Sequence, residues 1–82
     1  PNREQRIHAA FEAFIAAHGY LRANQLTFLR AVKAAVLRHG RITRAVLSKP
    51  PLSRVGRAEA LFPQQDLDEL ITLANRLLDE AA

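Results

Sequence analysis

The three histidines are the side chains of this sequence whose chemistry comes closest to catalysis or metal binding. His8 stands four residues after Glu4 and four before Glu12. On a helix this spacing puts the three side chains along one face, where an imidazole and two carboxylates can hold a metal ion. The same spacing is also ordinary patterning of a solvated helix surface, and no His-Glu-x-x-His pattern supports a metal. We therefore expect no metal site here.

The other candidates for catalysis lack the neighbours that it requires. His18 and His39 each precede a glycine, which is typical of a helix end. Ser48 and Ser53 lack the Gly-x-Ser-x-Gly context of a nucleophile, and no Walker A, Gly-x-Gly-x-x-Gly or EF-hand pattern occurs. The absence of cysteine excludes disulfides and cysteine-based zinc sites. We expect no catalytic residue, no bound cofactor and no metal in this chain.

Positive charge is concentrated in the first three quarters of the sequence. Residues 1–60 carry eleven Lys or Arg and three Asp or Glu, whereas residues 61–82 carry one Arg and five acids. From Arg22 to Arg57 there are nine basic residues and no acidic one. Such a stretch can attract phosphates or an acidic partner surface, or it can simply be solvated. Alternatively, the acidic C-terminal part folds back and neutralises part of it.

Direct DNA contact is one hypothesis that this basic stretch raises. Two of the helices predicted below, one ending near His39 and one over residues 43–49, are joined by residues 39–42. They follow each other as the two helices of a helix-turn-helix do. The second helix ends at two prolines and offers no Asn or Gln to read base edges, which disfavours sequence-specific recognition. Contacts to phosphates stay open as an alternative function. The candidate residues for such contacts are Arg38, Arg41, Arg44, Lys49, Arg54 and Arg57.

Length and composition indicate one small helical domain over residues 1–82. The chain is 49% hydrophobic and 24% charged, as in an ordinary globular domain. No apolar run reaches the roughly 18 residues of a membrane span. Residues 1–20 show no charged and then apolar leader, so we expect no signal peptide among them. The sequence begins at Pro1 and contains no methionine, so we expect a piece of a longer chain.

Apolar periodicity predicts two long helices in the first half. The spacing of three and four residues predicts a helix over residues 3–17, and Gly19 follows at the position of a left-handed cap. A second helix is predicted from Ala23 or Asn24 to about His39, because Asn24 suits an N-cap. Gly40 then ends this helix.

A short helix and a proline-rich loop are predicted to follow. Residues 43–49 form the short helix, which Thr43 caps and Pro50 ends. Residues 50–62 form a loop that packs through apolar anchors or holds a helical turn at residues 57–60.

The last helix is predicted to begin at Pro63, with acidic residues in its early turns where the helix dipole favours them. Its apolar stripe consists of Leu67, Leu70, Ile71, Ala74, Leu77 and Leu78. No segment alternates with the period of a strand. We predict an all-α bundle of three long helices and one short helix.

The order of several short motifs resembles a known family. The segment Gln25-Leu26-Thr27-Phe28-Leu29 is followed by Gly40-Arg41-Ile42, then by Pro50-Pro51-Leu52, and then by Leu61-Phe62-Pro63 before the last helix. Over roughly residues 10–80 this order resembles the C-terminal helical domain of the restriction (R) subunit of type I restriction-modification enzymes. One departure is Leu52, where the family often carries phenylalanine after proline.

The resemblance implies a parent enzyme that is an ATP-dependent DNA translocase and endonuclease. Its nuclease and motor domains, with their ATP and Mg²⁺, would lie upstream of this region, and no residue of their active sites carries over to this chain. The resemblance further implies that the domain docks the R subunit onto the modification methyltransferase, and that DNA is reached through the whole complex. It also implies the cytoplasm of a bacterium or archaeon, with no membrane partner.

One side of the second helix is the predicted docking surface. Leu26 and Leu37 do not fit its main apolar stripe, and basic residues lie near them, by about 100° of rotation per residue. An apolar patch with a basic rim can supply both affinity and register. Alternatively, both leucines face a neighbouring helix of the same domain. The predicted docking residues are Leu26, Arg30, Lys33 and Leu37, with Arg41 and Arg44 at the edge.

Overall fold

The computed structural model describes residues 2–81, and all regular secondary structure in this range is helical. The elements are α1 (Arg3–Ala17), α2 (Ala23–His39), the 3₁₀ helices η1 (Arg44–Ser48) and η2 (Leu52–Arg54), α3 (Ala58–Leu61) and α4 (Gln64–Ala81). The predicted all-α bundle with three long helices is confirmed. The connection between α2 and α4 holds three short helical segments. η1 and α3 lie where a short helix and a helical turn were predicted, and η2 was not predicted.

Both ends of α1 are fixed by local hydrogen bonds. The Asn2 side chain accepts a bond from the Gln5 backbone N–H at 2.9 Å, and the Gln5 side chain accepts one from the Asn2 N–H at 3.0 Å. This reciprocal capping box satisfies two amide groups that a helix start leaves free. At the other end the His18 ring bonds the Phe14 carbonyl at 3.0 Å, and Gly19 has φ +68°. The predicted left-handed glycine cap is therefore confirmed.

α2 begins at Ala23, as predicted, but its N-cap differs from the prediction. Arg22, not Asn24, is the N-cap, and Asn24 lies inside the first turn. The reason is Gln25, whose carboxamide accepts a bond from the Arg22 N–H and donates one to the Leu61 carbonyl, both at 2.8 Å. This side chain binds the helix start to α3, which no local N-cap preference can anticipate. α2 ends at His39 before Gly40, as predicted.

The segment after α2 is more ordered than the predicted loop. η1 covers most of the predicted short helix but is a 3₁₀ helix, and the Thr43 side chain makes no capping bond there. Five residues lie in η1 between an extended Thr43 and Lys49, which is slightly longer than most 3₁₀ helices. α3 confirms the predicted helical turn near residues 57–60, and its last residue is Leu61.

α4 begins one residue after Pro63, whose carbonyl accepts bonds from the amides of Asp66 and Leu67 at 3.0 and 3.2 Å. Pro63 thus takes the capping position and not the first helical position. Along α4 the predicted stripe faces inward. Leu67, Leu70 and Ala74 are buried, and Ile71, Leu77 and Leu78 are partly buried against the core.

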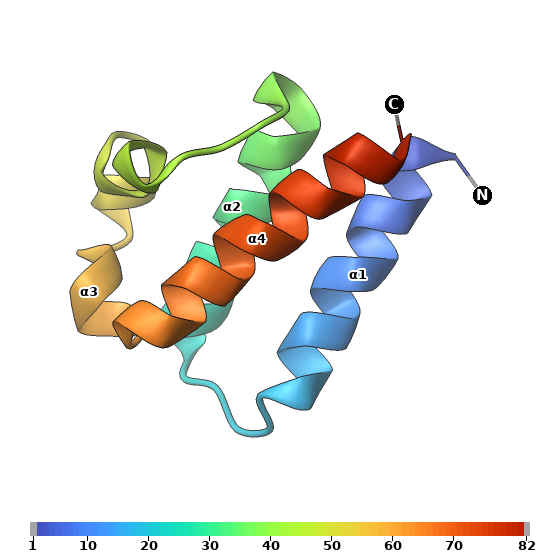
Figure 1. Cartoon of the computed structure of the whole chain (residues 1–82). Helices are drawn as coiled ribbons and strands as arrows, with labels where there is room; N and C mark the ends of the chain where they lie inside the picture. Colours follow the sequence, from blue (N-terminus) through green and yellow to red (C-terminus); the bar gives the residue numbers. More distant parts are fainter. Residues whose placement is uncertain (1, 82) are drawn as a thin grey trace.

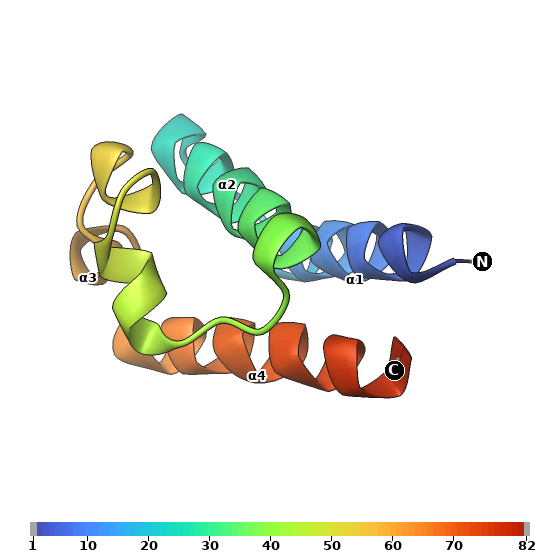
Figure 2. The ribbon, with the colours of Figure 1, turned by 90° about the horizontal axis from the view of Figure 1, so that it is seen from above.

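The three long helices surround one apolar core. α1 packs against both α2 and α4, and the segment from η1 to α3 lies on the side of α2 and α4 away from α1 (Figures 1 and 2). The start of α1 and the end of α4 lie on the same side of the molecule in both views. The Cα radius of gyration is 11.8 Å, close to the value of about 12 Å for a compact domain of this length.

All helices supply residues to this core. Its buried members are Ile7, Phe11, Phe28, Leu29, Val32, Val36, Ile42, Leu47, Leu52, Ala58, Leu61, Phe62, Leu67, Leu70 and Ala74. No charged or polar side chain within the described residues is buried. Among those same residues no helix has the length and apolar character needed to cross a membrane.

Candidate functional site

The four predicted docking residues lie along the flank of α2 that is closest to α1. The Lys33 ammonium is 3.0 Å from Nδ1 of His8 on α1, so this flank lines the seam between the two helices. Leu26 and Leu37 are half-buried, and Leu37 also packs against the core. Arg30 is exposed on the same flank. Neither leucine is fully buried, and docking through this flank stays a prediction.

His8 has a structural neighbour on each ring nitrogen. A lysine ammonium can only donate, so Nδ1 of His8 accepts from Lys33. Nε2 then faces the Glu12 carboxylate at 3.8 Å. Within residues 2–80 no group of three His, Asp or Glu side chains is arranged to hold a metal ion. The Glu4, His8 and Glu12 pattern is therefore a helix-surface pattern in this structure.

The six predicted phosphate contacts divide into two classes. Arg41 pairs with Asp79, and Arg44 pairs with Asp68 at 2.8 Å, so two carboxylates of α4 reach back to the basic stretch. These pairs are exposed, and each contributes at most about 1 kcal/mol to stability. Their main effect is to neutralise two of the candidate cations. Arg38, Lys49, Arg54 and Arg57 form no ion pair with any carboxylate among the described residues.

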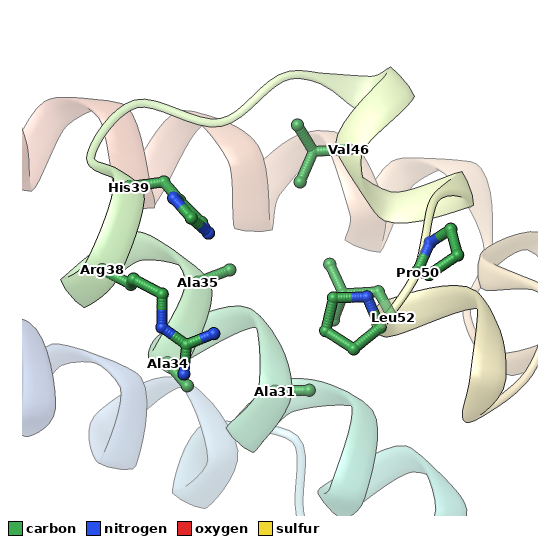
Figure 3. A pocket seen from close by; sticks show the side chains of 9 residues that line it. Ala31, Ala34, Ala35, Arg38, His39, Val46, Pro50 and Leu52 are labelled. Atoms are coloured by element: carbon green, nitrogen blue, oxygen red, sulfur yellow. The ribbon is translucent and has the colours of Figure 1, made fainter.

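A pocket of about 170 Å³ opens between α2 and the segment that follows it (Figure 3). Alanines of α2 line one side, and Val46 of η1 and Leu52 of η2 face them across the opening. Arg38 and His39 stand at one end of the pocket and Pro50 at the other. The full lining is Ala31, Ala34, Ala35, Arg38, His39, Val46, Pro50, Pro51 and Leu52. No acidic side chain is among these residues.

The Asn75 side chain of α4 holds the segment between α2 and η1 in place. The Asn75 carboxamide accepts a bond from the Ile42 backbone N–H and donates one to the Ile42 carbonyl, both at 3.2 Å. Both backbone groups are thereby satisfied without a helix or sheet partner. Because Val46 and Pro50 follow shortly after, this contact also helps to hold the outer side of the pocket in place.

We predict that Asn75→Ala lowers the free energy of unfolding by about 1–3 kcal/mol, because two partly buried backbone groups lose their partner. Urea unfolding followed by circular dichroism measures this change. Asn24→Ala is the matched control, since Asn24 is exposed in α2 and removing it is expected to change stability by less than about 0.5 kcal/mol. Equal stability of the two variants would contradict the role of Asn75.

The pocket was not foreseen from the sequence, although part of its signal is present there. Ala31, Ala34, Ala35 and Arg38 recur at helical spacing on the side of α2 next to the flank that bears Leu26 and Leu37. Short side chains on one helical flank leave space above it. Whether that space stays open depends on where residues 44–52 pass, and no periodicity in α2 contains that information.

The helix-turn-helix arrangement receives no support from this geometry. The element that would enter a groove is η1, a 3₁₀ helix of five residues. Its Leu47 is fully buried, and its Arg44 is paired with Asp68 of α4. A recognition helix needs an exposed face long enough to lie in the major groove, which η1 does not offer.

Comparisons with known proteins place the chain in a family. No curated protein matches the chain, and no solved structure does either. The family model of the EcoEI R protein C-terminal region matches residues 1–79, which includes α1 from its first residue. The match covers nearly the whole sequence, including the segment from Gln25 to the last helix. This chain therefore belongs to the family of C-terminal domains of type I restriction R subunits.

Proposed function

We propose that this chain is an assembly domain, without a catalytic site of its own, that docks the restriction subunit onto the modification methyltransferase. In this proposal the parent R subunit supplies the ATP-dependent translocase and nuclease, and the complex as a whole restricts foreign DNA in the cytoplasm. Family membership supports the link to an R subunit. The docking role goes further and is argued from the surface of α2.

The observation that carries the proposal is the combination of apolar and basic groups on α2 and the segment after it. One flank of α2 exposes parts of Leu26 and Leu37 beside Arg30 and Lys33. The neighbouring side of α2 opens into the apolar pocket with Arg38 at its end. Protein interfaces commonly join apolar anchors to a charged rim, which together give affinity and register.

A direct titration of the chain with the methyltransferase of its own restriction system tests this proposal. We expect saturable binding with a defined stoichiometry by isothermal titration calorimetry. The core variant Leu67→Asp serves as a control, because an unfolded chain has no docking surface. Absence of binding by the folded chain would overturn the proposal.

Contact with DNA phosphates is the second candidate function, and four unpaired cations favour it. If Arg38, Lys49, Arg54 and Arg57 all contact phosphates of a duplex, the logarithm of affinity should fall with the logarithm of salt concentration with a slope of about −3.6. Fluorescence anisotropy with a labelled duplex of mixed sequence measures this slope. No binding at low salt would eliminate the DNA function and leave the docking function unaffected.

A further inference from the structure

We infer that the pocket between α2 and η2 receives one apolar side chain from an acidic segment of the methyltransferase. This inference rests on the proposed docking function and specifies its chemistry. It places the anchor beside Ala31 and Ala34, on the side of α2 next to the flank that bears Leu26 and Leu37. The occupant is a protein segment with one Leu, Met or Phe anchor flanked by Asp or Glu.

The size of the pocket fits a single anchor side chain. Its volume is about 170 Å³. A cavity of roughly 150 Å³ in a protein interior accepts a benzene molecule, so this pocket has room for one branched aliphatic or aromatic side chain. It is too small for a folded element. A helix or an extended segment must therefore lie over the opening and insert one residue.

The walls of the pocket favour an apolar group over a polar one. Ala31, Ala34 and Ala35 present methyl groups, and their backbone amides and carbonyls are bonded inside α2. On the opposite side Pro50 and Pro51 have no backbone N–H to donate. A polar side chain would lose its bonds to water here without gaining equivalent ones.

The rim supplies the preference for acidic neighbours. Arg38 and His39 are exposed at one end of the pocket, and exposed Lys49 immediately precedes Pro50 at the other end. Arg38 and His39 lie in the last turn of α2, where the helix end carries about half a negative charge. The full positive charge of Arg38 exceeds this half negative charge. Lys49 lies outside the helix and adds a second positive charge. The surroundings of the pocket are therefore net positive and complementary to an acidic segment.

A DNA backbone could contact the basic rim but could not fill the apolar pocket. Its phosphates can pair with Arg38 and Lys49, but it has no apolar side chain to place against Val46 and Leu52. A peptide segment can supply both the charge and the anchor. The pocket and its rim, taken together, favour a protein partner over nucleic acid.

Two variants of the chain separate the pocket from the rest of the surface. Ala34 is exposed at the edge of the pocket, so Ala34→Phe fills the space without disturbing the core. Its control is Ala13→Phe on the exposed side of α1. Arg38→Glu reverses the charge at the rim, and Arg6→Glu makes the same change in net charge on α1. Circular dichroism establishes that each variant is folded.

The measurement is the affinity of each variant for the methyltransferase. We expect Ala34→Phe and Arg38→Glu each to weaken binding by at least about tenfold, as for residues at the centre of an interface. Both controls should bind like the unaltered chain. Unchanged binding by the first two variants overturns the inference alone, as does a similar loss in the controls. If the unaltered chain does not bind the methyltransferase, the proposed function is overturned as well.

Discussion

Replacing Phe28 by alanine is expected to destabilise the domain by about 3–5 kcal/mol, since a large buried aromatic side chain is removed. Phe28 is fully buried, and its ring lies 6.0 Å from that of Phe62, between α2 and the start of α4. A domain of this length has a total stability of about 4–12 kcal/mol. The variant should therefore unfold at a much lower temperature and urea concentration than the unaltered chain, and at the lower end of this range it is largely unfolded at 37 °C.

Tyr20→Ala is the matched aromatic truncation. Tyr20 is 89% exposed in the turn between α1 and α2, so its removal should change stability by less than about 0.5 kcal/mol. Thermal and urea unfolding of the two variants give the comparison. Similar losses of stability in Phe28→Ala and Tyr20→Ala would contradict the burial of Phe28 in the core.

The second large effect is expected from Leu67→Asp in α4. Leu67 is fully buried, and within residues 2–80 no buried cation is present to pair with a carboxylate there. The variant loses the apolar contacts of leucine, about 2–5 kcal/mol, and in addition buries an unpaired charged group. We expect loss of the folded state at neutral pH, seen as a collapse of the helical circular dichroism signal.

Gln64→Asp is the control for Leu67→Asp. It introduces an aspartate three positions earlier, at an exposed site in the first turn of α4. A carboxylate near a helix N-terminus is favourable by about 0.3–1 kcal/mol. This variant should therefore be as stable as the unaltered chain or slightly more stable. A folded Leu67→Asp variant would contradict the assignment of the buried face of α4.

The parts of this fold that sequence predicts well are those set by local periodicity. The stripe from Leu67 to Leu78 and the glycines after α1 and α2 follow from rules that act within a few residues, and the structure confirms them. The N-cap of α2 was predicted wrongly, because Arg22 takes that position and its amide bonds Gln25, which in turn bonds Leu61, 36 residues away. Such a contact depends on the tertiary fold.

The same distinction applies to the candidate site. The sequence raised the possibility that acidic residues fold back on the basic stretch, and the Arg44–Asp68 and Arg41–Asp79 pairs confirm it. Which cations would be paired could not be read from charge counts. Leu52, the departure from the family pattern, is buried in the core and also lines the pocket. This double role of Leu52 depends on how η1 and η2 pass over α2, which the sequence does not show.

A competition assay tests the docking claim most directly. Increasing amounts of this chain are added to an assembly reaction of the intact R subunit and methyltransferase, with ATP, Mg²⁺, S-adenosylmethionine as the methyl donor and unmethylated target DNA. We expect the chain to occupy the docking site, so that DNA cleavage falls as the chain increases while methylation continues, and Leu67→Asp has no effect. Undiminished cleavage at a large molar excess of the folded chain would contradict the docking function.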